Sequence, residues 1–94
     1  MQIRLGDVVK IVAIKDVFFT NISGTKEKPV RIIGIGSFRN SDRGLVLKNT
    51  SFIKIEGFSF NDFNTCIALI NSSNVSLSNI EVSNCKHGMV KIFL

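Results

Sequence analysis

One pattern of apolar and polar residues recurs along this chain about every 22 residues. The segments that begin at Val9, Val30, Ile53 and Val75 each read as apolar, polar, apolar, variable, small or Asn, apolar, and they start at nearly equal intervals. Alternation with a period of two is typical of a β-strand. The chain is therefore predicted to consist of short strands that return at a fixed interval.

A second motif recurs at the same interval as the first. Leu45-Val46-Leu47 and Ile67-Ala68-Leu69 lie eight residues before Ile53 and Val75, and Met89-Val90 begins a further copy. Each repeat then holds three short strands separated by turn-forming residues such as Asn and Ser. A repeat of this length leaves no room for a helix. We expect an all-β fold, a right-handed parallel β-helix of about four rungs of ~22 residues with uncapped ends.

In such a solenoid each residue lies about 4.8 Å from the residue one repeat later, so like residues stack on like. Asn49 is expected to stack on Asn71 as a step of a corner ladder, with Thr50 on Ser72 beside it. The inward columns are expected to be Leu45, Ile67 and Met89, and Ile55 and Leu77.

Two stretches depart from the repeat. Residues 36–43 are the least regular and are expected to form a loop that projects from the second rung. Lys91 falls where Leu47 and Leu69 point inward, so the last rung is expected to end there or to shift so that Val90, Ile92 and Leu94 face in.

Composition limits the chain to one small domain, residues 1–94, because 94 residues bury only one modest core. No apolar run approaches the roughly 18 residues that span a bilayer, and the first residues lack the order of a signal peptide. The net charge of +5 favours an acidic partner without identifying it.

The cysteines and the histidine give no sign of a metal or redox site. Cys85 lies three positions short of the residue that would stack on Cys66, so we expect free thiols unless a corner folds the two together. His87 is the only histidine and is expected at a corner, which leaves no multi-histidine metal site. No phosphate-cradling glycine motif is present, and no cofactor is expected.

A leucine-rich repeat is the rival fold, since its period also spans about 20 to 29 residues. The residues Leu77, Ile80, Val82 and Cys85 fit its strand signature. The fit fails one repeat earlier, where Phe63 stands in the place of Cys85, and the polar residues 71–76 form a poor helix. This reading is the less favoured.

Residues 22–36, ISGTKEKPVRIIGIG, and residues 44–60, GLVLKNTSFIKIEGFSF, resemble the opening rungs of right-handed parallel β-helix proteins of the pectate-lyase-like superfamily. This group includes polysaccharide lyases and related carbohydrate-active or surface proteins. The resemblance implies a secreted, periplasmic or cell-surface parent protein. It concerns architecture and is shared by proteins with different activities, so it does not give the function.

The segment Asn64-Thr65-Cys66-Ile67-Ala68-Leu69 is also similar to a segment of polygalacturonase-type glycosidases, in which two aspartates precede the cysteine. Glycoside hydrolysis needs two carboxyl groups, one to protonate the leaving oxygen and one to activate water. Here Asn64 and Thr65 replace the aspartates, and Asp62 alone cannot serve both roles. We therefore expect no catalytic residues in this chain.

One set of residues is a candidate binding site. Lys10, Arg31 and Lys54 occupy the same outward position in three successive repeats and would form a column of cations about 4.8 Å apart. Such a column suits the spaced carboxylates of an acidic polysaccharide. The alternative is a solvated face where the long side chains splay apart. Nucleic acid is disfavoured, because the chain has no Trp or Tyr and no recognised nucleic-acid motif.

Both ends of the chain carry strand-like sequence without polar caps, so the chain is expected to be a segment of a longer β-helix protein. The favoured function is binding of an acidic polysaccharide within a polysaccharide-lyase-like protein, without activity of the isolated chain. The alternative is a structural or adhesin module, as in a phage tailspike or a cell-surface protein. End-to-end self-association through the uncapped rungs is also expected.

Overall fold

The computed structural model describes residues 3–12, 17–35, 37–39 and 43–93. Within these ranges the chain forms strands, turns and bends but no helix, and thus none that could cross a membrane. The parallel strands stack as a β-solenoid of about three turns. This confirms the all-β, parallel β-helix prediction. The leucine-rich alternative is wrong, because each of its repeats needs a helical segment beside the strand.

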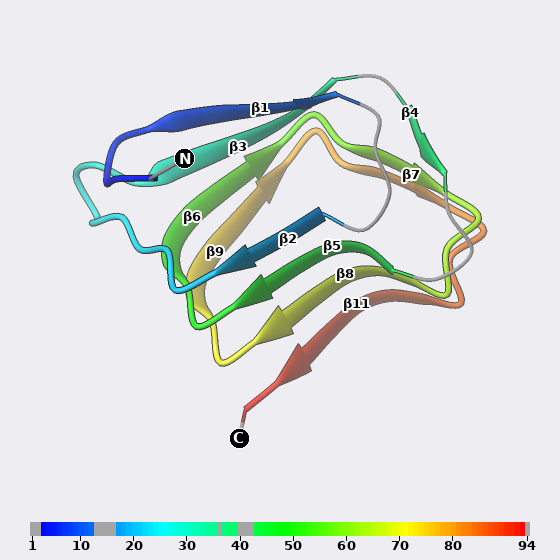
Figure 1. Cartoon of the computed structure of the whole chain (residues 1–94). Coiled ribbons are helices and arrows are strands. Elements are labelled where there is room, and N and C mark those ends of the chain that lie inside the picture. The colour runs from blue at the N-terminus through cyan, green and yellow to red at the C-terminus, as the bar shows by residue number, and fades with distance from the viewer. Residues whose placement is uncertain (1–2, 13–16, 36, 40–42, 94) are drawn as a thin grey trace.

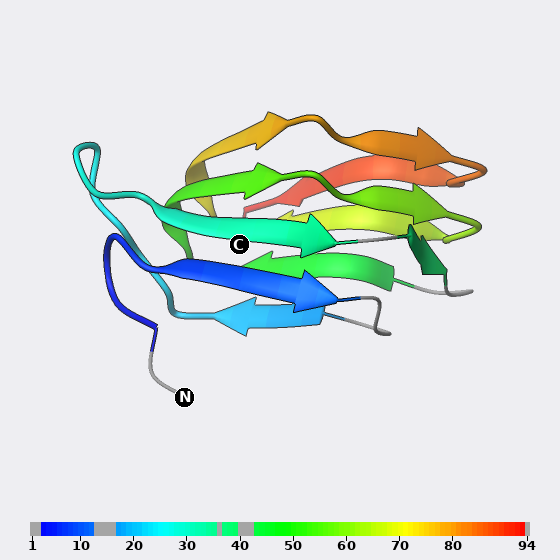
Figure 2. The same ribbon diagram turned by 90° about the horizontal axis from the view of Figure 1, so that it is seen from above.

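Three parallel sheets form the sides of the solenoid (Figure 1). The first sheet contains β1 (Val8–Val12), β3 (Val30–Ile35), β6 (Ser51–Glu56) and β9 (Ser73–Ser78). The second contains β4 (Ser37–Arg39), β7 (Ser59–Asn61) and β10 (Glu81–Ser83). The third contains β2 (Val17–Thr20), β5 (Arg43–Lys48), β8 (Thr65–Ile70) and β11 (His87–Ile92). Figure 2 shows the rungs stacked from β1 and β2 at one end to β9 and β11 at the other.

The register follows the sequence repeat in the later rungs. Leu45 pairs with Ile67 and Ile67 with Met89, and Ile55 pairs with Leu77, as predicted. Residues paired across parallel strands point to the same face of the sheet, so inward side chains stay inward from rung to rung.

The core fills the space between the three sheets. Val30, Ile32, Leu45, Leu47, Ile55 and Phe58 are completely buried. The rings of Phe58 and Phe60 stack with centroids 5.2 Å apart, and Phe63 meets Phe60 edge-on at 5.7 Å. A Cβ at position 34 would lie 2.6 Å from the ring of Phe58, so only glycine lets the ring lie against this strand.

The corners between the third and first sheets are built from polar ladders. Asn21, Asn49 and Asn71 all adopt positive φ, and Asn49 Nδ2 donates to Asn21 Oδ1 at 3.2 Å. Asn tolerates this left-handed backbone better than most residues. In the interior beside them, Thr50 Oγ1 donates to the Oγ of Ser72 at 2.9 Å. The predicted stacking of Thr50 on Ser72 is confirmed.

The predictions for the two irregular stretches need correction. Within the predicted loop at 36–43, residues 37–39 form β4, which pairs with β7, and Arg43 begins β5; residues 36 and 40–42 lie outside the described residues. Lys91 pairs with Leu69 in unbroken register, so the last rung neither ends there nor shifts, although Leu94 itself lies outside the described residues. A one-residue shift would turn Met89 outward, away from the core column.

The prediction of free thiols is wrong, because Cys66 and Cys85 form a disulfide. Their Cα atoms are 6.0 Å apart, within the range that a disulfide spans. Cys85 lies in the corner between β10 and β11, and Cys66 lies near the start of β8. An extended chain would hold the two residues too far apart, but the corner brings Cys85 back over the preceding rung.

Candidate binding face

The outward side chains of the first sheet include two of the three predicted cations in one column. Arg31 on β3 pairs with Lys54 on β6, and Lys54 pairs with Ser76 on β9, as predicted. Neighbouring strands of a sheet are about 4.8 Å apart, so the two cationic side chains leave the sheet from adjacent rungs.

Lys10 does not belong to this column, which corrects the sequence prediction. Lys10 pairs with Ile33, and Val8 is the residue that pairs with Arg31. The first repeat is displaced by two residues relative to the sequence alignment. A displacement of two keeps every inward residue inward, so the apolar pattern fits both registers equally well.

Arg31 is engaged within the chain. Its Nε donates to Glu56 Oε2 at 2.8 Å and its Nη2 donates to Glu56 Oε1 at 3.3 Å, a two-point ion pair between β3 and β6. The hydrogen bond from Arg31 lowers the pKa of Glu56 from its ordinary value, and the charges of Arg31 and Lys54 act in the same direction. The same hydrogen bond raises the pKa of Arg31. An anion that binds Arg31 must compete with Glu56.

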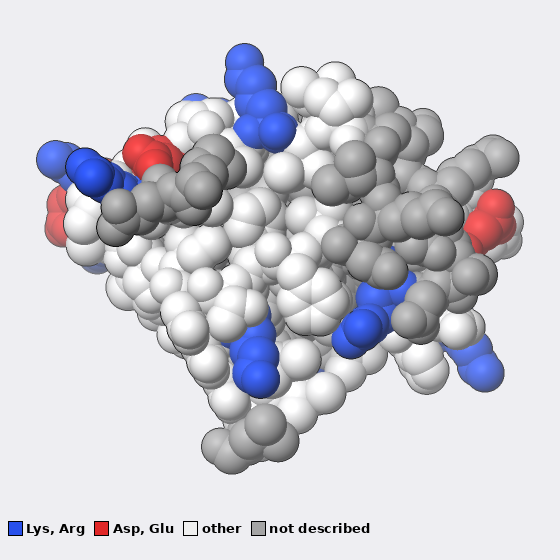
Figure 3. Space-filling model, viewed as in Figure 1, with Lys and Arg blue, Asp and Glu red and all other residues white. Residues whose placement is uncertain are grey.

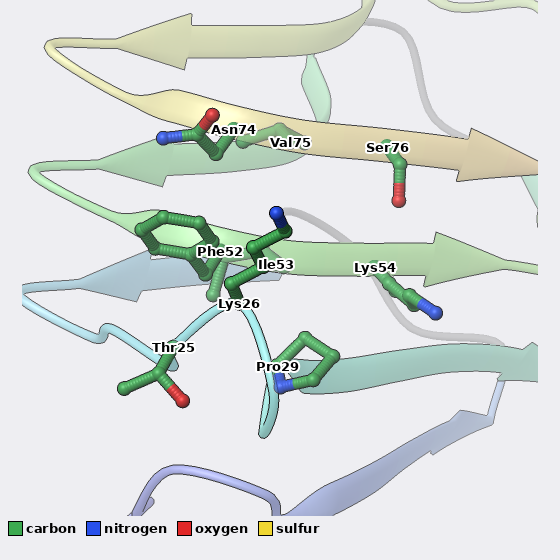
Figure 4. Close-up of a pocket in the computed structure, with 9 residues that line it drawn as sticks. All are labelled: Thr25, Lys26, Pro29, Phe52, Ile53, Lys54, Asn74, Val75 and Ser76. Atoms are coloured by element: carbon green, nitrogen blue, oxygen red, sulfur yellow. The ribbon is translucent and has the colours of Figure 1, made fainter.

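Lys54 stands between two open hollows on this face. One hollow, of about 560 Å³, is lined among others by Lys26, Phe52, Lys54 and Asn74 (Figure 4). The other, of about 620 Å³, is lined among others by Asp7, Glu27, Lys28 and Arg31. Pro29 and Lys54 line both hollows, so they are adjacent parts of one surface.

The two hollows differ in charge. We name the first one the Phe52 hollow. Its lining residues include two lysines and no carboxylate or imidazole. In the second, Asp7 and Glu27 offset part of the charge of three cations, Lys28, Arg31 and Lys54. The Phe52 hollow is therefore the better place for an anion.

A long corner between β2 and β3 builds one wall of the Phe52 hollow. The corner ladders step by 28 residues between the first two rungs, as from Asn21 to Asn49, but by 22 between the next two, as from Thr50 to Ser72. The extra residues form the loop at 24–29, which projects from the side of the stack in Figure 2.

Hydrogen bonds fix this loop in place. Gly24 N donates to Ser51 O at 2.9 Å, and Thr25 N donates to Lys28 O at 3.0 Å. Lys28 N donates in return to Thr25 Oγ1 at 3.0 Å. A Cβ at position 24 would lie 2.7 Å from Lys28 O, so only glycine lets the loop close on itself. Lys26 is therefore carried by a closed turn.

The repeat pattern did not identify Lys26 or Phe52. Lys26 lies in the inserted part of the corner, where the repeat has no equivalent position. Phe52 gave a usable signal, because it stands one repeat before Asn74, at a position where a turn former is expected.

Positive charge does not gather on the end of the solenoid where β1 and β2 lie. Figure 3 shows Lys and Arg scattered over the described part of that side, with uncharged surface between them. Among the described residues, no group of three or more His, Cys, Asp or Glu could hold a metal ion. The outer face of the first sheet is thus the candidate site.

The comparisons with known proteins give no relative: no family model, no curated protein and no solved structure matches this chain.

Proposed function

We propose that this chain binds an extended acidic polysaccharide along the outer face of its first sheet. The observation that carries the proposal is the position of Lys54, which stacks beside Arg31 and lines two adjacent hollows, one of which holds Lys26 and no acid. Carboxylates spaced along a sugar chain could meet Lys26, Lys54 and Arg31 in turn. Lys10, which lies over Ile33, is expected to contribute less.

The proposed activity is binding without turnover. The residues that line the Phe52 hollow include no Asp, Glu or His that could serve as a general acid or base. In a longer protein of the polysaccharide-lyase type, which the sequence resembles, this face would hold the polymer while other residues carried out the reaction.

The affinity is expected to be weak and sensitive to salt. Exposed ion pairs are individually weak, so a dissociation constant on the order of 1 mM is expected in low salt. Near 0.5 M salt, where charges are screened beyond about 4 Å, binding should be largely lost.

The test is polyuronate binding by the parent and by a Lys26→Gln, Lys54→Gln double variant, measured by calorimetry in low salt. The double variant should lose about tenfold in affinity with an unchanged circular dichroism spectrum. The control is Lys48→Gln, which removes a lysine that the register places on the third sheet, beside Ile70. Equal binding by the parent and the double variant would refute the proposal.

The Arg31–Glu56 ion pair favours a second candidate function, a structural or adhesin module with a solvated outer face. In this pair the charge of Arg31 is already balanced by Glu56 of the same chain. Such internal pairing is expected of a surface that binds no anion. If the parent binds no polyuronate in low salt, this second function replaces the first.

A further inference from the structure

Phe52 has a backbone conformation that suits other residues better. Its φ is 53°, and every other non-glycine residue with positive φ in the described ranges is Asn or Asp. Asn74, which occupies the equivalent position one rung later, has a φ of 54°. A bulky side chain is rare in this region, because its Cβ crowds the backbone. An asparagine at position 52 would therefore relieve strain without changing the corner.

The strained residue places its aromatic ring in the candidate site. The ring is only partly buried and lines the Phe52 hollow. Figure 4 shows the side chain of Lys26 extending from the loop toward β6, beside Phe52, while Lys54 lies farther along the same strand. Asn74 and Ser76 line the opposite side on β9. An apolar ring, two cations and three neutral polar side chains, those of Thr25, Asn74 and Ser76, thus line one open space.

This combination of groups matches the chemistry of a single acidic sugar. One face of a sugar ring carries C–H groups that pack on an aromatic ring, whereas its carboxylate needs a cation and its hydroxyls need hydrogen-bonding partners. A neutral sugar would place no negative charge beside Lys26 and Lys54. A simple anion such as phosphate would leave the ring of Phe52 without a partner.

We propose that the Phe52 hollow is a subsite for one uronate residue of the polysaccharide, which packs its ring on Phe52 and places its carboxylate at Lys26 or Lys54. This inference rests on the proposed function and specifies where one sugar of the polymer lies. It also gives a reason for an aromatic residue at a corner position where the backbone favours asparagine: fold stability is reduced in exchange for a binding surface.

The test compares Phe52→Asn with the parent in two measurements. The melting temperature should rise by about 5 °C, because Asn suits the backbone conformation. The affinity for a galacturonate tetrasaccharide in low salt should fall about fivefold, because the stacking surface is gone. A residue that only supports the fold would not change the two quantities in opposite directions. Phe52→Tyr, which keeps the ring, should bind as tightly as the parent.

The fully methyl-esterified tetrasaccharide, which has the same rings without the charges, should bind the parent at least tenfold more weakly. If Phe52→Asn binds galacturonate as tightly as the parent while the Lys26→Gln, Lys54→Gln variant does not, the subsite is refuted and the proposed function stands. If the parent binds neither galacturonate nor polyuronate, the proposed function and the subsite are both refuted.

Discussion

At the scale of single residues, Glu56 limits the charge that the binding face can offer. Its carboxylate receives two hydrogen bonds from Arg31, and Lys54 on the same strand also interacts with it electrostatically. Glu56 thus occupies cations that an acidic ligand would need. The two-point pair fixes the guanidinium of Arg31 beside Glu56, although the side chain stays exposed to solvent.

Glu56→Gln should therefore strengthen polyuronate binding at neutral pH by roughly twofold to fivefold, measured by calorimetry in low salt. Glu81→Gln is the matched control, because it removes the same charge from β10 in the second sheet. If both variants strengthen binding equally, the effect comes from net charge and not from the release of Arg31.

The same pair gives a pH dependence of stability with a defined sign. The pKa of Glu56 is lowered in the folded chain, so its stabilising contribution is complete above the ordinary value of 4.5 and is lost as the pH falls through the lowered pKa. Melting curves should therefore show the parent above Glu56→Gln at neutral pH, with the difference disappearing in acid. A difference that persists or grows in acid would contradict this assignment.

At the scale of elements, the disulfide joins β8 to the corner between β10 and β11 in the next rung. Cys66 is fully buried near the start of β8, and Cys85 precedes β11. The backbone adds two hydrogen bonds at this place, from Lys86 N to Phe63 O at 3.1 Å and from His87 N to Asn64 O at 2.7 Å. Together they fix the register of β11, the strand that contains Lys91.

Replacing both cysteines by serine should lower the free energy of unfolding by about 3 kcal/mol, because the cross-link closes a loop with a sequence separation of 19 residues. Urea unfolding followed by circular dichroism measures the loss. Reduction of the parent with dithiothreitol should produce a similar shift. An unchanged unfolding midpoint after reduction would show that the cross-link does not stabilise the fold.

At the scale of the whole molecule, Lys91 marks one end of the described solenoid as different from its interior. It continues the inward column of Leu47 and Leu69, yet it is exposed because no described strand covers β11 on that side. Large apolar residues such as Leu77, Met89 and Phe93 are exposed around it. A charge that points inward at a sheet edge opposes the addition of another strand, since stacking would bury it.

Lys91→Leu should consequently favour association of two chains through β11, seen as a concentration-dependent rise in sedimentation coefficient. Lys48→Leu is the control, because it adds the same apolar side chain beside Ile70 on an outward position of the third sheet. Equal association of the two variants would indicate nonspecific hydrophobic association and not stacking of rungs.

The sequence alone determined the all-β solenoid, the register of its later rungs and the stacking of Arg31, Lys54 and Ser76. These features follow from a nearly constant repeat length and from apolar and polar residues that alternate with a period of two. Both are local properties of the chain. The register of β1, the disulfide and the Phe52 hollow were decided by the tertiary structure. A two-residue slip preserves the alternation, and only a folded corner brings Cys85 to Cys66 or the loop at 24–29 to Phe52. Such contacts depend on how the chain turns between strands, and a repeat pattern carries no information about that.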